Sequence, residues 1–364
     1  MKIKTALKIG ELTAKIPVIQ GGMGVGISLS KLAGNVAKCG GVGVISSAQI
    51  GFRDPDWDEN PLEANLKALK EEIRKAREIA EGHGIIAVNI MVATRFYEKY
   101  VKTAAEAGAD LIISGAGLPV DLPKFVAGTK TKIAPIVSSL KSFDVISRYW
   151  MKKYNRKPDL VVIEGPLAGG HLGFKREELE SIESLCYEQE VRRIIDRVRS
   201  SEGEERIPVA VAGGIYEAKD ALPYFAMGAD AVQAATRFVT AYECDADVRY
   251  KEAYIRAKKE DIEIVKSPVG MPGRAIHNAF LDGAAKGSVP GPMGKGAWKC
   301  HQCLARCNPA EIPYCITDAL VNAARGNIEN GLLFCGANAY KATKLEHVSD
   351  IMREFEEELT CQPE

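Results

Sequence analysis

The sequence lacks a net charge and lacks any long apolar run. Its 48 Lys and Arg residues balance 48 Asp and Glu residues, so no overall field attracts nucleic acid or an anionic membrane. The opening MKIKTALKIGELTAKIPVIQGG carries Lys and Glu throughout and is too polar for a signal peptide or membrane span. We therefore expect a cytoplasmic protein that binds neither nucleic acid nor membrane and acts on a small-molecule substrate.

Low-complexity segments are absent too. The chain is also too long to be a small domain that depends on disulfides for its stability. The chain has 364 residues and nine cysteines. A chain of this length buries a large core without disulfides. The cysteines therefore point to thiol or metal chemistry in a reducing compartment.

Eight short β-branched apolar runs, each followed by helical periodicity, dominate the first part of the chain. This pattern is typical of parallel strands buried on both faces. A helix is predicted over 61–81, with Pro61 at its first position, and another over 94–107. Eight such units predict a closed (β/α)8 TIM barrel of α/β class rather than an open doubly wound sheet. The runs are residues 17–20, 42–46, 85–91, 110–115, 133–138, 159–165, 209–214 and 230–234.

Two segments depart from this repeat. Residues 174–206 lengthen the sixth connection with a charged helix, and we expect this segment to lie over the strands' carboxyl ends as a lid or substrate wall. Beyond residue 240 the pattern changes to helix, a Gly/Pro-rich stretch (residues 287–298) and a cysteine cluster. We expect a barrel over 1–240 and a helical, cysteine-containing extension over 241–364 that covers the barrel mouth. The sequence does not set the oligomeric state and is compatible with a homodimer.

Small residues follow the seventh and eighth predicted strands, where TIM barrels bind phosphate. Gly213 and Gly214 allow backbone N–H groups to approach a ligand without a Cβ in the way. Residues 233–238 open a helix whose N-terminus offers free N–H donors, and Thr236 adds a hydroxyl. Either motif alone fits a tight turn, but the two together favour a phosphate site.

Other polar and small residues follow the remaining strands. The IQGGMG segment (19–24) lets the main chain approach a flat ring, against which Met23 can pack. The amide of Asn89 suits the edge of a heterocycle, although a buried Asn that satisfies a neighbouring loop explains it equally well. Lys141 and Glu164 are aimed at the same mouth.

His171, in GPLAGGHLG (165–173), is the only histidine flanked by glycines at the end of a predicted strand. Imidazole titrates near neutral pH and can take and return a proton. Gly169, Gly170 and Gly173 clear space around it. We predict that His171 is a catalytic acid or base, the alternative being a structural histidine.

With these motifs the chain resembles the nitronate monooxygenase family and the related FMN-dependent enoyl-(acyl carrier protein) reductases, over roughly residues 10–280. Where the family normally has MGTRF, this chain has AATRF at 234–238. The motifs are PVIQGGMG (17–24), VNIMV (88–92), PIVSS (135–139), EGPLAGGHLG (164–173), VAVAGGI (209–215) and GADAVQAATRF (228–238).

The resemblance implies a non-covalent FMN at the barrel mouth with His171 beside it. It implies either oxidation of nitronates or NAD(P)H-dependent reduction of an enoyl thioester. A non-flavin sugar-phosphate lyase is a rival for which only Lys141 and Glu164 are candidate catalysts, and an electron-transfer module is another. The implied FMN-binding residues are Gln20, Gly21, Gly22, Met23, Asn89, Lys141, Glu164, Gly170, Gly213, Gly214, Gln233, Ala234, Ala235 and Thr236.

Four cysteines form a C-x2-C-x3-C-x7-C array: Cys300, Cys303, Cys307 and Cys315. Such spacing can place four thiolates around one metal. Three explanations compete, namely a [4Fe–4S] cluster, structural zinc, and cysteines that are only paired or buried. The array resembles the one beside the flavin of clostridial enoate-type reductases, which favours the iron–sulfur cluster and, with it, the reductase reaction.

Overall fold

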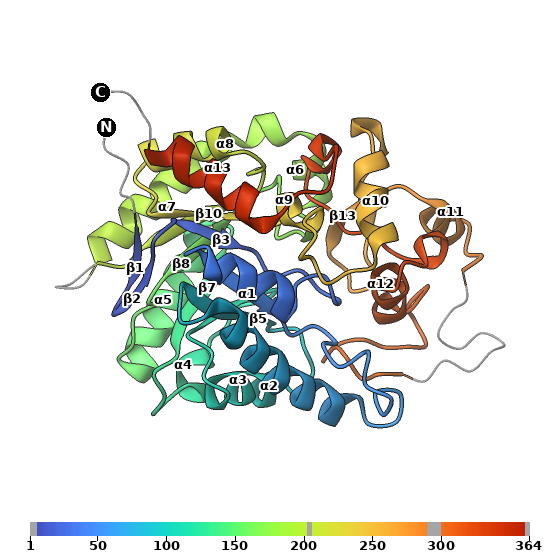
Figure 1. The fold of residues 1–364 in the computed structure, drawn as a ribbon, viewed down its shortest axis with the longest axis horizontal. Coiled ribbons are helices and arrows are strands. Elements are labelled where there is room, and N and C mark those ends of the chain that lie inside the picture. Colours follow the sequence, from blue (N-terminus) through green and yellow to red (C-terminus); the bar gives the residue numbers. More distant parts are fainter. Residues whose placement is uncertain (1–5, 202–205, 290–299, 361–364) are drawn as a thin grey trace.

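A computed structural model describes residues 6–201, 206–289 and 300–360, and it shows a closed barrel of eight parallel strands (Figure 1). The TIM barrel predicted from the sequence is confirmed. Most of the Gly/Pro-rich stretch and Cys361 lie outside the described residues. Around the barrel the strand order is β10-β11-β3-β4-β5-β6-β7-β8.

Each barrel strand overlaps one of the eight apolar runs. The alternate side chains that point inward form the interior core, and the others pack under the surrounding helices. The barrel closes where β11 pairs with β3, with Gln233 opposite Ile19. The strands are β3 (Val18–Gln20), β4 (Val42–Ser46), β5 (Ile85–Met91), β6 (Leu111–Gly115), β7 (Lys132–Val137), β8 (Val161–Glu164), β10 (Val209–Ala212) and β11 (Ala231–Ala234).

A ring of helices covers the barrel. The last of them, α13, comes from the end of the chain and packs between α1 and α8 (Figure 1). The segment after residue 240 therefore completes the ring as well as reaching the mouth. The ring consists of α1 (Ser30–Lys38), α2 (Pro61–Ala80), α3 (Tyr97–Glu106), α4 (Leu122–Phe125), α5 (Leu140–Tyr154), α7 (Tyr187–Ser201), α8 (Ala218–Ala226) and α13 (Val348–Thr360).

Two helix predictions need correction. Helix α3 begins three residues later than predicted, because Phe96 adopts a left-handed conformation with φ of 65°. The charged helix α7 is no lid, because its buried residues, which include Val191 and Ile194, pack on the outside of the barrel. Only the chain before it reaches the mouth, through β9 (Gly170–His171), α6 (Arg176–Glu180) and η1 (Ile182–Leu185).

The end of the barrel opposite the mouth is closed by a hairpin of β1 (Leu7–Ile9) and β2 (Leu12–Ala14), which the sequence analysis did not predict. Its residues Leu7 and Ile9 are fully buried in the interior core. At the same end, three aspartates that precede strands accept backbone N–H bonds from neighbouring strands. The bonds are Ile86 to Asp110 (2.9 Å), Ile133 to Asp159 (2.8 Å) and Val209 to Asp230 (2.9 Å).

The extension after β11 adds a small sheet and short helices on one side of the mouth (Figure 1). In this sheet β13 pairs with β12 and with β9, so the extension contacts the segment that carries His171. Its elements are α9 (Thr236–Val239), α10 (Val248–Arg256), η2 (Lys259–Asp261), β12 (Ile262–Lys266), β13 (Pro272–Ile276), α11 (Ala279–Ala285), α12 (Ile316–Ala324), η3 (Ile328–Asn330) and η4 (Ala339–Lys341).

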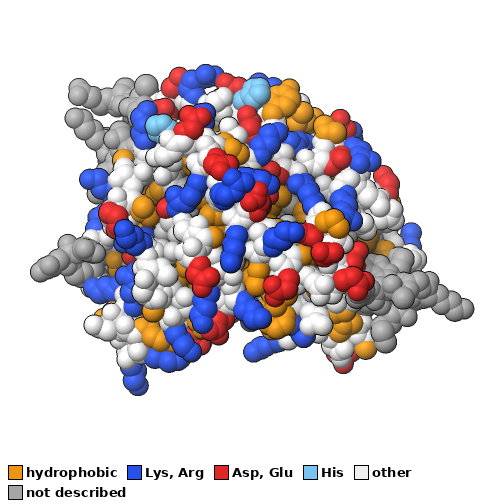
Figure 2. All heavy atoms as spheres, turned by 60° about the horizontal axis from the view of Figure 1, so that its bottom comes forward, with side chains coloured by type: hydrophobic (Ala, Val, Ile, Leu, Met, Phe, Trp, Pro, Cys, Tyr) orange, Lys and Arg blue, Asp and Glu red, His pale blue; other side chains and the backbone are white. Residues whose placement is uncertain are grey.

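The surface mixes charges of both signs. Figure 2 shows Lys and Arg side chains interspersed with Asp and Glu over the face that it presents, and α2 carries exposed pairs such as Arg74 with Glu71. Within the described residues, no helix is long and apolar enough to cross a membrane.

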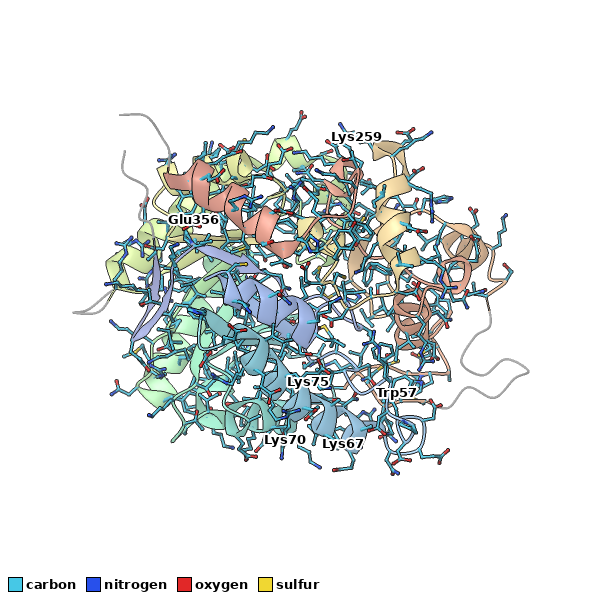
Figure 3. All side chains as sticks on the ribbon, viewed as in Figure 1. Trp57, Lys67, Lys70, Lys75, Lys259 and Glu356 are labelled. Carbon is cyan, nitrogen blue, oxygen red and sulfur yellow. The ribbon has the colours of Figure 1, made fainter. Side chains whose placement is uncertain are left out.

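Helix α13 is held to the barrel by a buried ion-pair group. The Arg237 guanidinium, with 10% of its side chain exposed, lies 3.1 Å from the Glu346 carboxylate and 2.8 Å from Glu354 on α13. It also stacks over the ring of Tyr216 at 5.0 Å. A second, more exposed ion pair also holds α13. In it the Lys15 ammonium lies 2.6 Å from the carboxylate of Glu356, which is labelled in Figure 3.

We predict that Arg237→Met lowers the free energy of unfolding by about 3 kcal/mol, because two partly buried carboxylates lose their partner. Urea denaturation followed by circular dichroism measures this loss. The matched control is Arg353→Met on α13 itself, where the pair with Asp350 is exposed and a loss below about 1 kcal/mol is expected. Equal losses in the two variants would contradict the anchoring role.

Candidate active site

A cavity of about 390 Å³ opens at the carboxyl ends of the barrel strands. It brings together most of the residues that the sequence singled out, from segments far apart in the chain. No Lys or Arg is found among the described residues that line it. The predicted residues that line it are Gly21, Gly22, Met23, Asn89, Glu164, Gly170, His171, Gly213, Gly214, Gln233, Ala235 and Thr236.

Three predicted site residues do not line the cavity. Gln20 is fully buried, and its Oε1 accepts a hydrogen bond from the Val44 N–H at 3.1 Å. Ala234 is buried, and its carbonyl accepts the Gly21 N–H at 2.9 Å. Lys141 is the second residue of α5, and because the helix turns its side chain outward, it is exposed to solvent.

The glycine turn after β10 and the Ala235–Thr236 turn after β11 form one end of the cavity. Gly213 and Gly214 have φ of 99° and 83°, a conformation that favours glycine. The Thr236 hydroxyl accepts a hydrogen bond from the Gly336 N–H at 3.0 Å, and the Asn338 side chain donates to the Gly214 carbonyl at 2.7 Å. This end therefore offers backbone groups and small side chains to a ligand.

The loop 335–338 of the extension is a wall of the cavity that the sequence analysis missed. Its signal was the run of small residues Cys335-Gly336-Ala337 beside Asn338. Cys335 itself is buried, and burial raises the pKa of its thiol to about 12. It therefore contributes a neutral, small side chain.

Close backbone approach also shapes the side of the cavity next to β3. A Cβ on Gly22 would overlap the Asn89 side chain, and a Cβ on Gly21 would lie 3.2 Å from the side chain of Gln233. Glycine is needed here for a main chain that packs flat against its neighbours. The result is a narrow slot beside Asn89, continuous with the turns after β10 and β11.

This cavity fits a flavin mononucleotide. The turns after β10 and β11 leave room for a phosphate that is bound through backbone N–H groups, as is common after the last two strands of a TIM barrel. The slot beside Gly21, Gly22 and Met23 suits a flat ring, and Asn89 can bond a heterocycle edge.

His171 lies on β9 and is held by the extension. Its backbone pairs with Gly273 on β13, its Nε2 lies 2.8 Å from the Ser267 hydroxyl, and the Phe334 ring packs edge-on at 5.0 Å. Burial lowers the pKa of His171 to about 4. The imidazole is therefore neutral near pH 7. Ser267 and Phe334 were missed because nothing in the sequence links them to His171.

Glu164 ends β8 and is the one carboxyl among the described residues that line the cavity. Burial raises the pKa of its carboxyl to about 7. The Tyr187 hydroxyl lies within hydrogen-bond distance of the backbone carbonyls of Ser138 (2.9 Å) and Glu164 (3.0 Å), and its one proton is donated between them, which holds the ends of β7 and β8 together. The carboxyl therefore stands at a rigid position and changes charge near neutral pH.

The four cysteines of the predicted metal site lie near one another. Burial raises the pKa of Cys303, and Cys307 and Cys300 raise it further. Among the described residues, which include all four, no three or more His, Cys, Asp or Glu side chains are placed to hold a metal ion. A metal at this array therefore stays a prediction from the sequence.

The cysteine segment is attached to the loop after β5. The Arg95 N–H donates to the Cys303 carbonyl at 3.0 Å. His301 lies 3.0 Å from Asp318 through Nε2 and stacks on Trp57, labelled in Figure 3, with ring centroids 3.8 Å apart. These contacts give the segment a structural role at the barrel mouth.

Comparison with known proteins gives a family match along nearly the whole chain. The family model described as nitronate monooxygenase matches residues 5–358. A relative described as a probable nitronate monooxygenase, from Staphylococcus saprophyticus, is 24% identical over 304 residues, which cover 77% of this chain and 81% of the relative.

Two solved structures share the architecture. FabK from Thermotoga maritima is 25% identical, with a TM-score of 0.69 and 95% of each chain covered. A nitroalkane oxidase from Streptomyces ansochromogenes is 18% identical, with a TM-score of 0.68, and the match covers 94% of this chain and 95% of that one. The second similarity shows the fold alone.

The raised pKa of Glu164 gives a testable pH dependence. Between its ordinary pKa of 4.5 and about 7, the folded protein keeps a proton that the unfolded chain has lost, so the free energy of unfolding falls as pH rises. We predict that Glu164→Gln, without added flavin, is more stable than the wild type at pH 8 by on the order of 2 kcal/mol, and not at pH 4.

Urea denaturation at the two pH values measures this difference. The lowered pKa of His171 acts in the opposite direction but is common to both proteins, so it cancels. Glu106→Gln, an exposed carboxyl on α3, is the matched control and should show no such pH-dependent gain. If the free energy of unfolding of Glu164→Gln changed with pH in the same way as that of the wild type, the pKa of the Glu164 carboxyl would not be raised in the folded protein.

Proposed function

Because the chain belongs to the nitronate monooxygenase family, we propose that it is an FMN-dependent oxidoreductase that oxidises nitronates beside His171. The observation that carries this proposal is the cavity itself, which has His171 on one wall and the backbone of Gly213, Gly214 and Thr236 on another. A redox cofactor with a phosphate and a flat ring suits these two walls, because its phosphate would bind the backbone N–H groups and its ring would lie beside His171.

In this proposal the protein binds and orients, while the cofactor carries out the redox chemistry. When bound, FMN supplies the capacity to take electrons from an electron-rich carbon or from NAD(P)H. Gly214, Ala235 and Thr236 would hold its phosphate, with Gly22 and Asn89 along its ring. A site built this way holds its charged group with N–H dipoles instead of cationic side chains.

His171 would act on the substrate. It is the imidazole that lines the cavity, and its neutral form at pH 7 can hydrogen-bond to a nitro, nitronate or carbonyl oxygen. The apolar side chains of Met271, Leu320 and Phe334 also line the cavity. They exclude water, which strengthens hydrogen bonds at the reacting group.

Reduction of an enoyl thioester by NAD(P)H is the second candidate function. One observation favours it: the described lining residues include no Lys or Arg that could pair with the negative charge of a nitronate. A thioester carbonyl is neutral and needs only a hydrogen-bond donor. The two candidates share the FMN site and His171, and they differ in substrate.

We predict that the purified protein contains about one FMN per chain, and that Ala235→Asp weakens FMN binding at least about tenfold more than Ala235→Asn. The two side chains have the same shape, but only Asp places a negative charge beside a phosphate. Flavin fluorescence titration of the apoprotein measures both affinities. The difference in FMN affinity between the two variants should become smaller at high salt, because salt screens the repulsion. Equal affinities would mean that the phosphate lies elsewhere.

Iron, sulfide and zinc should be assayed in the same anaerobically purified sample. Flavin is the expected result, and the metal content tests the site predicted at the cysteine array. About four irons per chain would support an iron–sulfur cluster and would make enoyl thioesters the first substrates to assay. Flavin without iron or zinc would leave these cysteines with a structural role. A protein that takes up no flavin would defeat the proposed function.

We predict that His171→Ala retains FMN but loses about 10²–10⁴-fold in turnover, because the cavity wall stays while the imidazole that would contact the substrate is gone. The assay compares nitronates with oxygen against an enoyl thioester with NAD(P)H. The exposed His347, which pairs with Glu243 on the surface, serves as control through His347→Ala, with turnover unchanged. Full activity in His171→Ala would remove this residue from the mechanism.

A further inference from the structure

The Ser267 hydroxyl is the one side-chain group within hydrogen-bond distance of His171 in the described residues. Ser267 is fully buried and sits in the turn between β12 and β13, where its N–H donates to the Met271 carbonyl at 3.1 Å. This turn belongs to the extension, nearly 100 residues from the histidine that it contacts. The position of Ser267 is therefore set within the extension, and not by residues 168–171 (the AGGH loop), which carry the histidine.

Counting donors and acceptors determines which way this hydrogen bond runs. A hydroxyl has one proton to donate. Besides His171 Nε2, the other partner of the Ser267 oxygen is the Val269 N–H at 3.4 Å, which is itself a donor. If Nε2–H donated to Ser267, the buried hydroxyl proton would be left without an acceptor, and such groups are rarely left unpaired.

We infer that the Ser267 hydroxyl donates to Nε2 of His171 and so holds the neutral imidazole with its proton on Nδ1. Nδ1 makes no hydrogen bond within the described residues, and the ring lines the cavity. His171 therefore meets the substrate as an N–H donor to an oxygen atom, and it is not the base that removes a proton from carbon. Ser267 is a positioning residue, because it acts through His171.

The AGGH loop is braced so that this orientation persists. The Arg274 guanidinium is buried and donates to the carbonyls of Ala168 and, at 2.9 Å, Pro166. A Cβ on Gly273 would lie 2.8 Å from the Phe334 ring, so glycine at this position lets Phe334 pack against the imidazole. The Arg274 bonds hold the backbone of the loop, and rotation of the imidazole away from Ser267 would have to displace its packing against Phe334.

This inference rests on the proposed function for its consequence in substrate choice. A nitronate has already lost its α-proton and presents two oxygens to a donor, whereas a neutral nitroalkane still requires a base. We therefore expect the enzyme to consume the nitronate form and to depend on a preceding deprotonation, in solution or by another enzyme, for its supply.

The first test is ¹⁵N NMR of the flavin-loaded protein labelled at histidine, with the His171 signals identified by their loss in His171→Gln. The expected result is a protonated Nδ1 and an unprotonated Nε2 at pH 7. Ser267→Ala should abolish this preference. Thr131→Val, which removes a buried hydroxyl donor at the opposite end of the barrel, should leave it unchanged. An Nε2–H tautomer in the wild type would overturn the inference.

The second test compares propyl nitronate with neutral 1-nitropropane, each added fresh at pH 7. We expect kcat/KM to favour the nitronate by at least about 100-fold, and Ser267→Ala to lose about tenfold on the nitronate. Equal use of the neutral nitroalkane would overturn the donor role. If neither compound is consumed, the proposed function fails, while the NMR result still decides the tautomer.

Discussion

The parallel pairing of β11 with β3 is the interaction on which the rest of this molecule depends, because it closes the sheet into a barrel. Closure places the glycine segment after β3 next to the Ala235–Thr236 turn after β11, although more than 200 residues separate them. In an open sheet these segments would lie at opposite edges. The interior core and the β1–β2 hairpin stabilise this closed state from within.

The chemistry nevertheless depends on the extension as much as on the barrel. His171 lies in a glycine-rich loop that has little rigidity of its own. Its backbone is fixed by β13, its Nε2 faces Ser267 and its ring contacts Phe334. Since α13 returns to complete the helix ring, the extension is anchored at its far end by Arg237. Barrel stability and site geometry are therefore coupled.

Low charge is the physical character of the site. Burial keeps His171 neutral and raises the pKa of Glu164 toward neutrality, and the described lining includes no Lys or Arg. Oriented N–H groups can stabilise a negative charge in such a site without cationic side chains, which is what the proposed function requires of it.

The sequence by itself determined the barrel, since eight apolar runs and their glycine ends follow from local periodicity and turn chemistry. It also led to His171 and to eleven of the fourteen predicted FMN-binding residues that line the cavity, because strand ends of a TIM barrel converge at one mouth. It misplaced Lys141, whose direction depends on where α5 turns, and the metal predicted at the cysteine array stays a prediction. Only the tertiary structure brought Ser267, Phe334 and the 335–338 loop to the site, because contacts between residues so far apart in the chain leave no periodic signal.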